Sequence, residues 1–323
     1  MKFAIKSACA ALGLAVTTVT FGQLAAYPTK PIRIIIPYAP GGGVDTVIRQ
    51  LSPQMSEILG KPIIVENKPG GGTMNATDFV AKSPADGYTL LATGAPIYLN
   101  TALGLKTPYD PMKDLAPISL LVNNPGIIVV NSDTPVKSMK ELVEYSKKQP
   151  NGLNYGSAGV GSIGHLGGEL LKAKSGVKMN HIPYKGSSPA LVDLVGGQIS
   201  VLVDVIIPTA VQVKAGKSIG LAVASNVRSP ILPNVPTLAE AGYPGVNFGG
   251  TFGMMAPAKT SPEVIAKIHA AMLKVITTTQ MRKQLNDMGF EIIANTPEEY
   301  GVFIRNEIAT WSRIVKDNDI KAE

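Results

Sequence analysis

The sequence predicts an α/β protein built from two lobes, and three observations support this prediction. After the first 26 residues, apolar and β-branched runs alternate with segments of helical periodicity, which is typical of parallel strands joined by crossover helices. Residues 27–323 are more than a single core usually organises, so we expect two domains. Hydrophobic residues make up 45% of the chain and charged residues 16%, as in a globular protein with a well-filled core.

Two series of alternating elements are expected. The first contains strands at 32–36, 63–65 and 88–93 and helices at 44–59 and 73–81. The second contains strands at 127–130, 154–155, 181–184, 201–203 and 221–223.

The two expected crossings between the lobes are the segment VNNPG at 122–126 and the proline-rich segment 226–236. We therefore expect residues 27–124 plus 226–323 to form the first lobe and residues 125–225 to form the second.

Several helix starts are marked by capping residues. A Ser or Thr followed three residues later by Glu predicts a capping box at Ser138, Thr237 and Thr296, and Ser261 precedes a proline that suits a first helical turn. Gly242 and Gly289 are the matching stop signals.

Residues 1–26 are expected to be a secretory signal peptide. Lys2 and Lys6 precede the uncharged apolar run 7–21, and small residues allow the mature chain to begin at Gln23 or Tyr27. No later apolar run is long enough to span a membrane. The single cysteine, Cys9, lies in this segment, so the mature chain would have no thiol; lipidation of Cys9 is the alternative.

The charge balance is mildly basic. The formal net charge of +7 becomes +5 without Lys2 and Lys6, which suits an anionic ligand but does not require one. No run of Lys or Arg interleaved with aromatic residues points to nucleic acid.

Three glycine clusters, at 41–43, 70–72 and 159–161, each lie where a strand passes into a helix. Glycine lets the backbone approach a ligand, and the first amides of a helix have no internal partner, so each cluster could hold a carboxylate or a phosphate. A tight turn is the alternative for any single cluster, but three clusters in one chain favour a site.

Sequence motifs for catalysis or cofactor binding are weak or missing. Residues 159–164 match the dinucleotide pattern GxGxxG, but the ribose-binding acid expected about 20 residues later is replaced by YKGS at 184–187. The patterns GxSxG, GxxxxGK[ST] and HExxH do not occur, and His165, His181 and His269 lack metal-like spacing. We therefore expect no cofactor, no metal and no catalytic residue.

Three polar side chains remain open between a structural and a binding role. Asp45, in the first turn after the first glycine cluster, is expected to order the loop or bind a hydroxyl or water, because a carboxylate would repel an anion. His165 lies one turn into the helix after the third cluster, where its ring could reach a ligand. Asp204 interrupts an apolar strand, where a carboxylate needs a hydrogen bond.

Longer segments carry a family resemblance. They are YPTKPI at 27–32, PYAPGGGVD at 37–45, VENKPGGG at 65–72, PADGYTL at 84–90, YDP at 109–111, YGSAG at 155–159, PYKG at 183–186, GGQ at 196–198, SPILPNVPT at 229–237 and AP at 256–257. Together they resemble, in order, the Bug family, the substrate-binding proteins of tripartite tricarboxylate transporters.

The resemblance implies a type II periplasmic binding protein fold, in which two Rossmann-like lobes joined by two crossings close on a ligand. It implies a monomeric periplasmic receptor that delivers a small carboxylate to membrane transporter subunits and catalyses no reaction. The ligand-binding residues it implies are Tyr38, Pro40, Gly41, Gly42, Asp45, Thr93 and Gly94 in the first lobe, and Ser157, Gly159, Ser162, His165 and Asp204 in the second.

The identity of the ligand stays open. Many relatives carry a polar residue and then Asn-Pro after the equivalent of Thr93-Gly94, whereas this chain has APIYLNT at 95–101, so the cleft is expected to be less polar there. A dicarboxylate, an amino acid, a nicotinate-like acid and an aromatic acid all fit. A sensory receptor for the same ligand and an enzyme acting on a small acid are the alternative functions.

Overall fold

The computed structural model describes residues 27–320, so the expected signal peptide lies outside the described residues. Within this range a mixed ten-stranded sheet has the order β2-β1-β3-β9-β4-β7-β5-β6, with β8 and β10 also paired to β4. The strands are β1 Ile32–Ile36, β2 Ile63–Asn67, β3 Thr89–Thr93, β4 Leu115–Asn131, β5 Leu153–Ser157, β6 Met179–Pro183, β7 Val201–Val205, β8 Ser218–Ala224, β9 Gly249–Pro257 and β10 Glu291–Ile292. The predicted alternation of strands and helices is confirmed.

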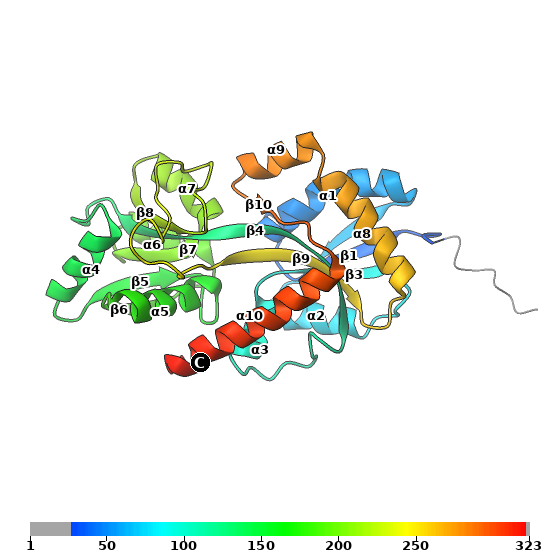
Figure 1. Cartoon of the computed structure of the whole chain (residues 1–323), viewed down its shortest axis with the longest axis horizontal. Helices are drawn as coiled ribbons and strands as arrows, with labels where there is room; N and C mark the ends of the chain where they lie inside the picture. The colour runs from blue at the N-terminus through cyan, green and yellow to red at the C-terminus, as the bar shows by residue number, and fades with distance from the viewer. Residues whose placement is uncertain (1–26, 321–323) are drawn as a thin grey trace, which may run out of the picture.

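The helices cover both faces of this sheet (Figure 1). They are α1 Gly43–Leu59, α2 Met74–Ala81, α3 Pro96–Ala102, α4 Met139–Lys148, α5 Ile163–Ser175, α6 Ser187–Val195, α7 Ile206–Lys214, α8 Pro262–Ile276, α9 Thr279–Asp287 and α10 Pro297–Asp317, with a short 3-10 turn η2 at Gly71–Thr73. None of the helices within residues 27–320 combines the length and apolar character needed to cross a bilayer.

Strand β4 runs through both halves of the molecule (Figure 1). Residues 115–125 pair with β9, and from Gly126 onward the same strand pairs with β7 and β8. The segment 122–126, which was expected to be a crossing between the lobes, is therefore part of one continuous strand. Pro125 has no amide to donate, but Gly126 donates to the carbonyl of Phe248 at 2.8 Å, so the ladder continues.

Strand directions place two sets of loops opposite each other. Strands β1, β2 and β3 are parallel, and two antiparallel pairings, β3 with β9 and β9 with β4, make them parallel to β4 as well. Strands β5, β6 and β7 are parallel to one another and antiparallel to β4. The carboxyl ends of the two sets therefore point toward each other, which is where ligands bind in open α/β sheets.

Apolar side chains of β1 divide between the two faces of the sheet. Ile32, Ile34 and Ile36 are fully buried in a core with α1 and α8, whereas Ile35 is buried in the core on the opposite face. Each such side chain contributes about 2 kcal/mol of hydrophobic stabilisation. The second core continues along α10, which Figure 1 shows running from the half with β1 toward α5.

Three of the four predicted helix starts are confirmed. Ser138, Ser261 and Thr296 each accept a backbone hydrogen bond at the start of α4, α8 and α10, and Thr296 forms a complete capping box with Glu299.

The helix predicted at Thr237 does not form. Thr237 and Glu240 make the reciprocal hydrogen bonds of a capping box, at 2.8 and 3.1 Å, yet the segment is only a turn. The amide of Leu238, which would have no partner inside a helix, donates to the carbonyl of Val223 in β8. The amide of Ala241 donates to the carbonyl of Thr237, but Gly242 has φ +96° and Pro244 follows, so the segment ends after this single turn.

Candidate functional site

The first glycine loop, residues 38–43, connects β1 to α1. Gly41 has φ +85°, a conformation that favours glycine, and Gly42 is the extended residue that precedes the helix. Asp45, in the first helical turn, is buried and accepts a hydrogen bond from the amide of Gly41 at 3.0 Å. The carboxylate that holds this loop in place therefore belongs to the helix that follows the loop.

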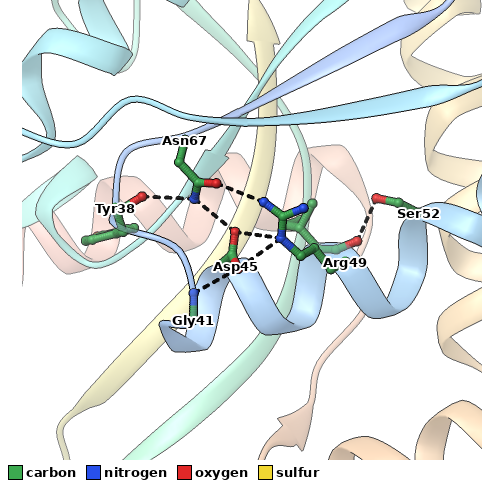
Figure 2. Close-up of polar contacts among 7 residues, drawn as sticks. Tyr38, Gly41, Asp45, Arg49, Ser52 and Asn67 are labelled. Carbon is green, nitrogen blue, oxygen red and sulfur yellow. Dashed lines mark hydrogen bonds and ion pairs between the residues drawn. The ribbon is translucent and has the colours of Figure 1, made fainter.

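The Asp45 carboxylate is saturated by groups of the protein (Figure 2). Arg49 Nε lies 3.0 Å from each carboxylate oxygen, and Asn67 Nδ2 donates to Oδ1 at 2.9 Å and to the carbonyl of Tyr38 at 3.0 Å. Arg49 also donates to Asn67 Oδ1 at 2.8 Å, which closes the network. Burial acts to raise the pKa of Asp45, but the hydrogen bonds from Arg49, Gly41 and Asn67 outweigh it and hold the pKa below its usual value.

This network determines which groups can reach a ligand. The Gly41 amide is used by Asp45, so the donors left at the positive end of α1 are the amides of Gly42, Gly43 and Val44, which have no partner within the helix. Pro40 precedes them and has no amide hydrogen. The loop can therefore bind an anion through its backbone, with Asp45 as organiser.

The second glycine loop, residues 157–162, connects β5 to α5. Gly159 and Gly161 have φ +130° and +72°, and Ser162 caps the helix by accepting from the amide of His165 at 3.2 Å. Ser157 is fully buried; its Oγ accepts from the amide of Gly159 at 3.1 Å and from Ser162 Oγ at 3.3 Å. Ser157 thus organises this loop from inside.

Two histidines complete the second loop. His181 Nε2 lies 2.7 Å from Ser157 Oγ, and the His181 ring stacks on His165 with 4.0 Å between ring centres. The amide of Gly161 donates to His165 Nδ1 at 3.1 Å, which requires that nitrogen to be unprotonated. Burial, and then the nearby His165, lower the pKa of His181 to about 4. No sequence pattern assigns His181 to the site, because it lies 24 residues after Ser157.

The floor between the loops comes from β9 and the end of β7. A Cβ at Gly43 would lie 2.8 Å from Cε2 of Phe252, and a Cβ at Gly250 would lie 3.4 Å from Cγ1 of Val205. The start of α5 packs on β7, since a Cβ at Gly164 would clash with the carbonyl of Val203. The start of α1 therefore meets β9, the start of α5 meets β7, and Gly250 lies where the two strands come together.

Phe252 and Val205 are site residues that the sequence reading missed. Neither is polar, so neither stood out as a residue that could bind a ligand. The glycines at 249, 250 and 253 are the one available signal, because glycine in a strand marks a close approach of another group.

Thr93 and Gly94, at the end of β3, have structural partners. The Thr93 hydroxyl lies 2.6 Å from the hydroxyl of Tyr300 in α10, and a Cβ at Gly94 would clash with the hydroxyl of Tyr38. Burial raises the pKa of Tyr38 above its usual value, so its hydroxyl stays neutral. Tyr38 and Gly94 are thus packed together beside the first glycine loop.

Asp204 lies on the far side of β7 from this floor. Side chains alternate along a strand, and Asp204 shares its face with Leu202, which belongs to the core under α6 and α7. Its Oδ1 accepts from the amide of Val205 at 2.8 Å, while Oδ2 is buried without a regular hydrogen bond from the described residues. Burial raises the pKa of Asp204 to about 6, and the nearby Ser187 hydroxyl limits the rise.

The glycine cluster at 70–72 forms a turn that protein groups fill. A Cβ at Gly71 would lie 2.8 Å from Oδ1 of Asn75, and Asn100 donates to the carbonyl of Gly72 at 3.2 Å. This cluster therefore fits the turn interpretation, and the other two fit an anion site.

The sequence matches one family model over most of its length. The model is TctC, Tripartite tricarboxylate transporter family receptor, and it matches residues 47–320. The chain belongs to this family. The predicted resemblance to Bug proteins is confirmed: Protein BugT of Bordetella pertussis is 34% identical over 297 residues, which are 91% of each chain.

Solved structures of related proteins share the fold. The structure of Rpa4515 from R. palustris with adipate is 31% identical, with a TM-score of 0.84 over 92% of this chain and 99% of that one. The structure of MatC from Rhodopseudomonas palustris with bound malate is 31% identical, with a TM-score of 0.79 over 90% and 100%. The predicted two-lobe, type II binding protein fold is thereby confirmed, and the chain is a solute-binding receptor of the TctC family.

Proposed function

We propose that this TctC receptor holds one carboxylate of a small dicarboxylic acid between the two glycine loops and presents it to the membrane subunits of its transporter. The observation that carries the proposal is that the two glycine loops follow β1 and β5, whose carboxyl ends point toward each other across the crossing strands. In both loops the polar side chains form hydrogen bonds with other groups of the protein. The backbone amides at the helix starts are therefore the groups left to bind an anion. Malate and adipate, bound by two related proteins, are both dicarboxylates.

The predicted site residues other than Asp204 then have two roles. Gly42, with Gly43 and Val44, supplies amides from the first loop, and the first amides of α5 supply the second. Gly41, Asp45, Ser157, Gly159, Ser162 and His165 shape the loops, while Pro40, Tyr38, Thr93 and Gly94 pack around the first one.

We further propose that the lobes divide near residues 124 and 249. Residues 226–248 pack with the second lobe, since Val223 donates to Pro236 at 2.8 Å and Leu232 and Val235 join the core under α6 and α7. The second boundary therefore falls later than the expected residue 226. Closure would be a hinge motion at the two crossings of β4 and β9. We propose that the receptor is exported to the periplasm and acts there as a monomer.

Thermal-shift measurements on the mature protein test this function. Malate, adipate, glutamate, nicotinate and benzoate are compared with glucose, and an acid at 100 times its dissociation constant should add ~2.7 kcal/mol to the free energy of unfolding. Stabilisation by glucose and by none of the acids would reject the proposal.

The substitution Gly42→Val tests the site itself. Gly42 has φ −76°, and a Cβ there meets no atom closer than 3.7 Å, so valine is tolerated in the fold while its branches cover the amides. We expect a folded protein that no longer binds the acid. Gly301→Ala in α10, where the new methyl group meets only ordinary contacts, is the control that keeps binding. Wild-type affinity in folded Gly42→Val would place the site elsewhere.

An enzyme remains the second candidate because of one contact. Ser157 Oγ and His181 Nε2 are 2.7 Å apart, the spacing of a nucleophile and its base. Ser157 is fully buried, however, and the ring next to His181 is His165 instead of a carboxylate. We therefore expect no product when the protein is incubated with the acid that it binds, as checked by NMR of the recovered ligand; any turnover would favour the enzyme.

A further inference from the structure

A cavity of 220 Å³ lies on the other face of the crossing strands. Along β9, Phe252 faces the start of α1, whereas the neighbouring Thr251 lines the cavity and bonds to Tyr98 Oη at 3.0 Å. Successive residues of a strand point to opposite faces, so the cavity lies on the face of β9 opposite to α1, and Ile163, the first residue of α5, is among its lining residues.

Both lobes contribute to the walls of this hinge cavity. Ala224 and Ser225 come from the end of β8, and Phe303, Glu307 and Trp311 come from three successive turns of α10. Figure 1 shows α10 crossing the junction of the two halves, where it packs against β4 and α3. The cavity is therefore present only where the two lobes meet.

The chemistry of the walls is aromatic and acidic. Tyr98, Phe303 and Trp311 supply rings, and the charged side chains lining the cavity within residues 27–320 are those of Glu291 and Glu307. Glu307 Oε2 accepts from Trp311 Nε1 at 2.8 Å, which fixes the carboxylate against the indole. An organic anion would be repelled here, whereas an ammonium group is attracted both by carboxylates and by aromatic faces.

We propose that the hinge cavity binds a small organic ammonium compound, whose charge lies against Glu307 and whose alkyl groups pack on the aromatic walls. The site does not depend on the carboxylate-binding function of the glycine loops. Its volume suits a few heavy atoms, so choline is a suitable probe.

Trp311 makes the proposal directly measurable. It is the one tryptophan in the sequence, and its indole lines the cavity, so its fluorescence reports on an occupant. Choline chloride is titrated into the mature protein against sodium chloride at equal ionic strength. We expect a saturable change in Trp311 emission with choline and none with the sodium salt.

Variants separate the hinge cavity from other binding sites. Glu307→Gln keeps an acceptor for Trp311 but removes the charge, and should weaken choline binding about tenfold or more. Glu291→Gln, at an exposed position of β10, should weaken it by a smaller factor without affecting folding. Glu298→Gln, on the exposed first turn of α10, is the matched control and should bind as the wild type does.

Two results would overturn the proposal. One is the absence of a saturable response, or an unchanged affinity in both Glu307→Gln and Glu291→Gln. The other is loss of choline binding in Gly42→Val, which would place the cation between the glycine loops. Retained choline binding in Gly42→Val, together with lost acid binding, supports both sites independently.

Discussion

The two glycine loops begin α1 and α5 in the same way but are held by different chemistry. In the first loop a buried carboxylate, Asp45, gathers Gly41, Arg49 and Asn67 around itself. In the second loop the uncharged side chains of Ser157, His165 and His181 hold the loop in its conformation through hydrogen bonds. A charged and a neutral organiser both leave backbone amides free for an anion, but they differ in strength and in their response to pH.

Removal of the Asp45 carboxylate should have the largest effect. Asp45→Ala leaves the Gly41 amide and the Asn67 amide group without their acceptor, so we expect the free energy of unfolding to fall by about 2–3 kcal/mol. Urea denaturation measures this. Asp86→Ala, which removes an exposed ion pair with Lys30, should cost less than about 1 kcal/mol. Equal losses in the two variants would show that Asp45 is not a special organiser.

Acid should weaken the second loop before the first. His181 has a pKa lowered from 6.5 to about 4, so the unfolded chain binds more protons between these values. Its stabilising contribution is complete above pH 6.5 and is lost as the pH falls toward 4, by about 1–3 kcal/mol. The Asp45 contribution, with a pKa below 3.8, is present above that value and is lost only at lower pH.

The variant His181→Gln checks this assignment. Glutamine can still bond to Ser157 but does not titrate, so the fall in stability between pH 6.5 and 4 should be smaller than in the wild type. Denaturation curves at several pH values measure the difference. Parallel curves for the two proteins would mean that His181 does not make the second loop sensitive to acid.

Within the first loop, Gly41 and Gly42 should respond differently to alanine. Gly41→Ala forces a side chain into φ +85° and should cost about 1–2 kcal/mol. Gly42→Ala, at φ −76° with open space around it, should change stability by less than about 0.5 kcal/mol. Thermal unfolding of the pair tests this, and the opposite order would contradict the loop geometry.

Removal of the Ser157 hydroxyl should have the smallest effect. Ser157→Ala loses hydrogen bonds inside the second loop, worth about 1 kcal/mol, but leaves the backbone amides in place. We expect the dissociation constant of the bound acid to stay close to that of the wild type, as measured by calorimetry. A large loss of affinity with intact stability would make Ser157 a direct ligand group.

Sequence reasoning worked best where the deciding hydrogen bonds are local. The role of Asp45 as loop organiser was predicted because its partner, Gly41, lies four residues away at a helix start. The same reasoning failed at Thr237, where the local capping bonds form but the segment ends after one turn, at Gly242 with φ +96° before Pro244. It placed an interlobe crossing at 122–126, but proline and glycine give no sign that this crossing is part of one continuous strand.

The sequence by itself determined the two-lobed α/β class, the glycine-opened helix starts, the organising side chain Asp45, and membership of the TctC family. These depend on periodicity and on contacts within a few residues. Only the tertiary structure decided that Phe252 and Val205 form the floor, that Asp204 faces the opposite core, and that His181 holds Ser157. Such contacts join residues tens to hundreds of positions apart, and strand pairing, which no local pattern encodes, brings them together.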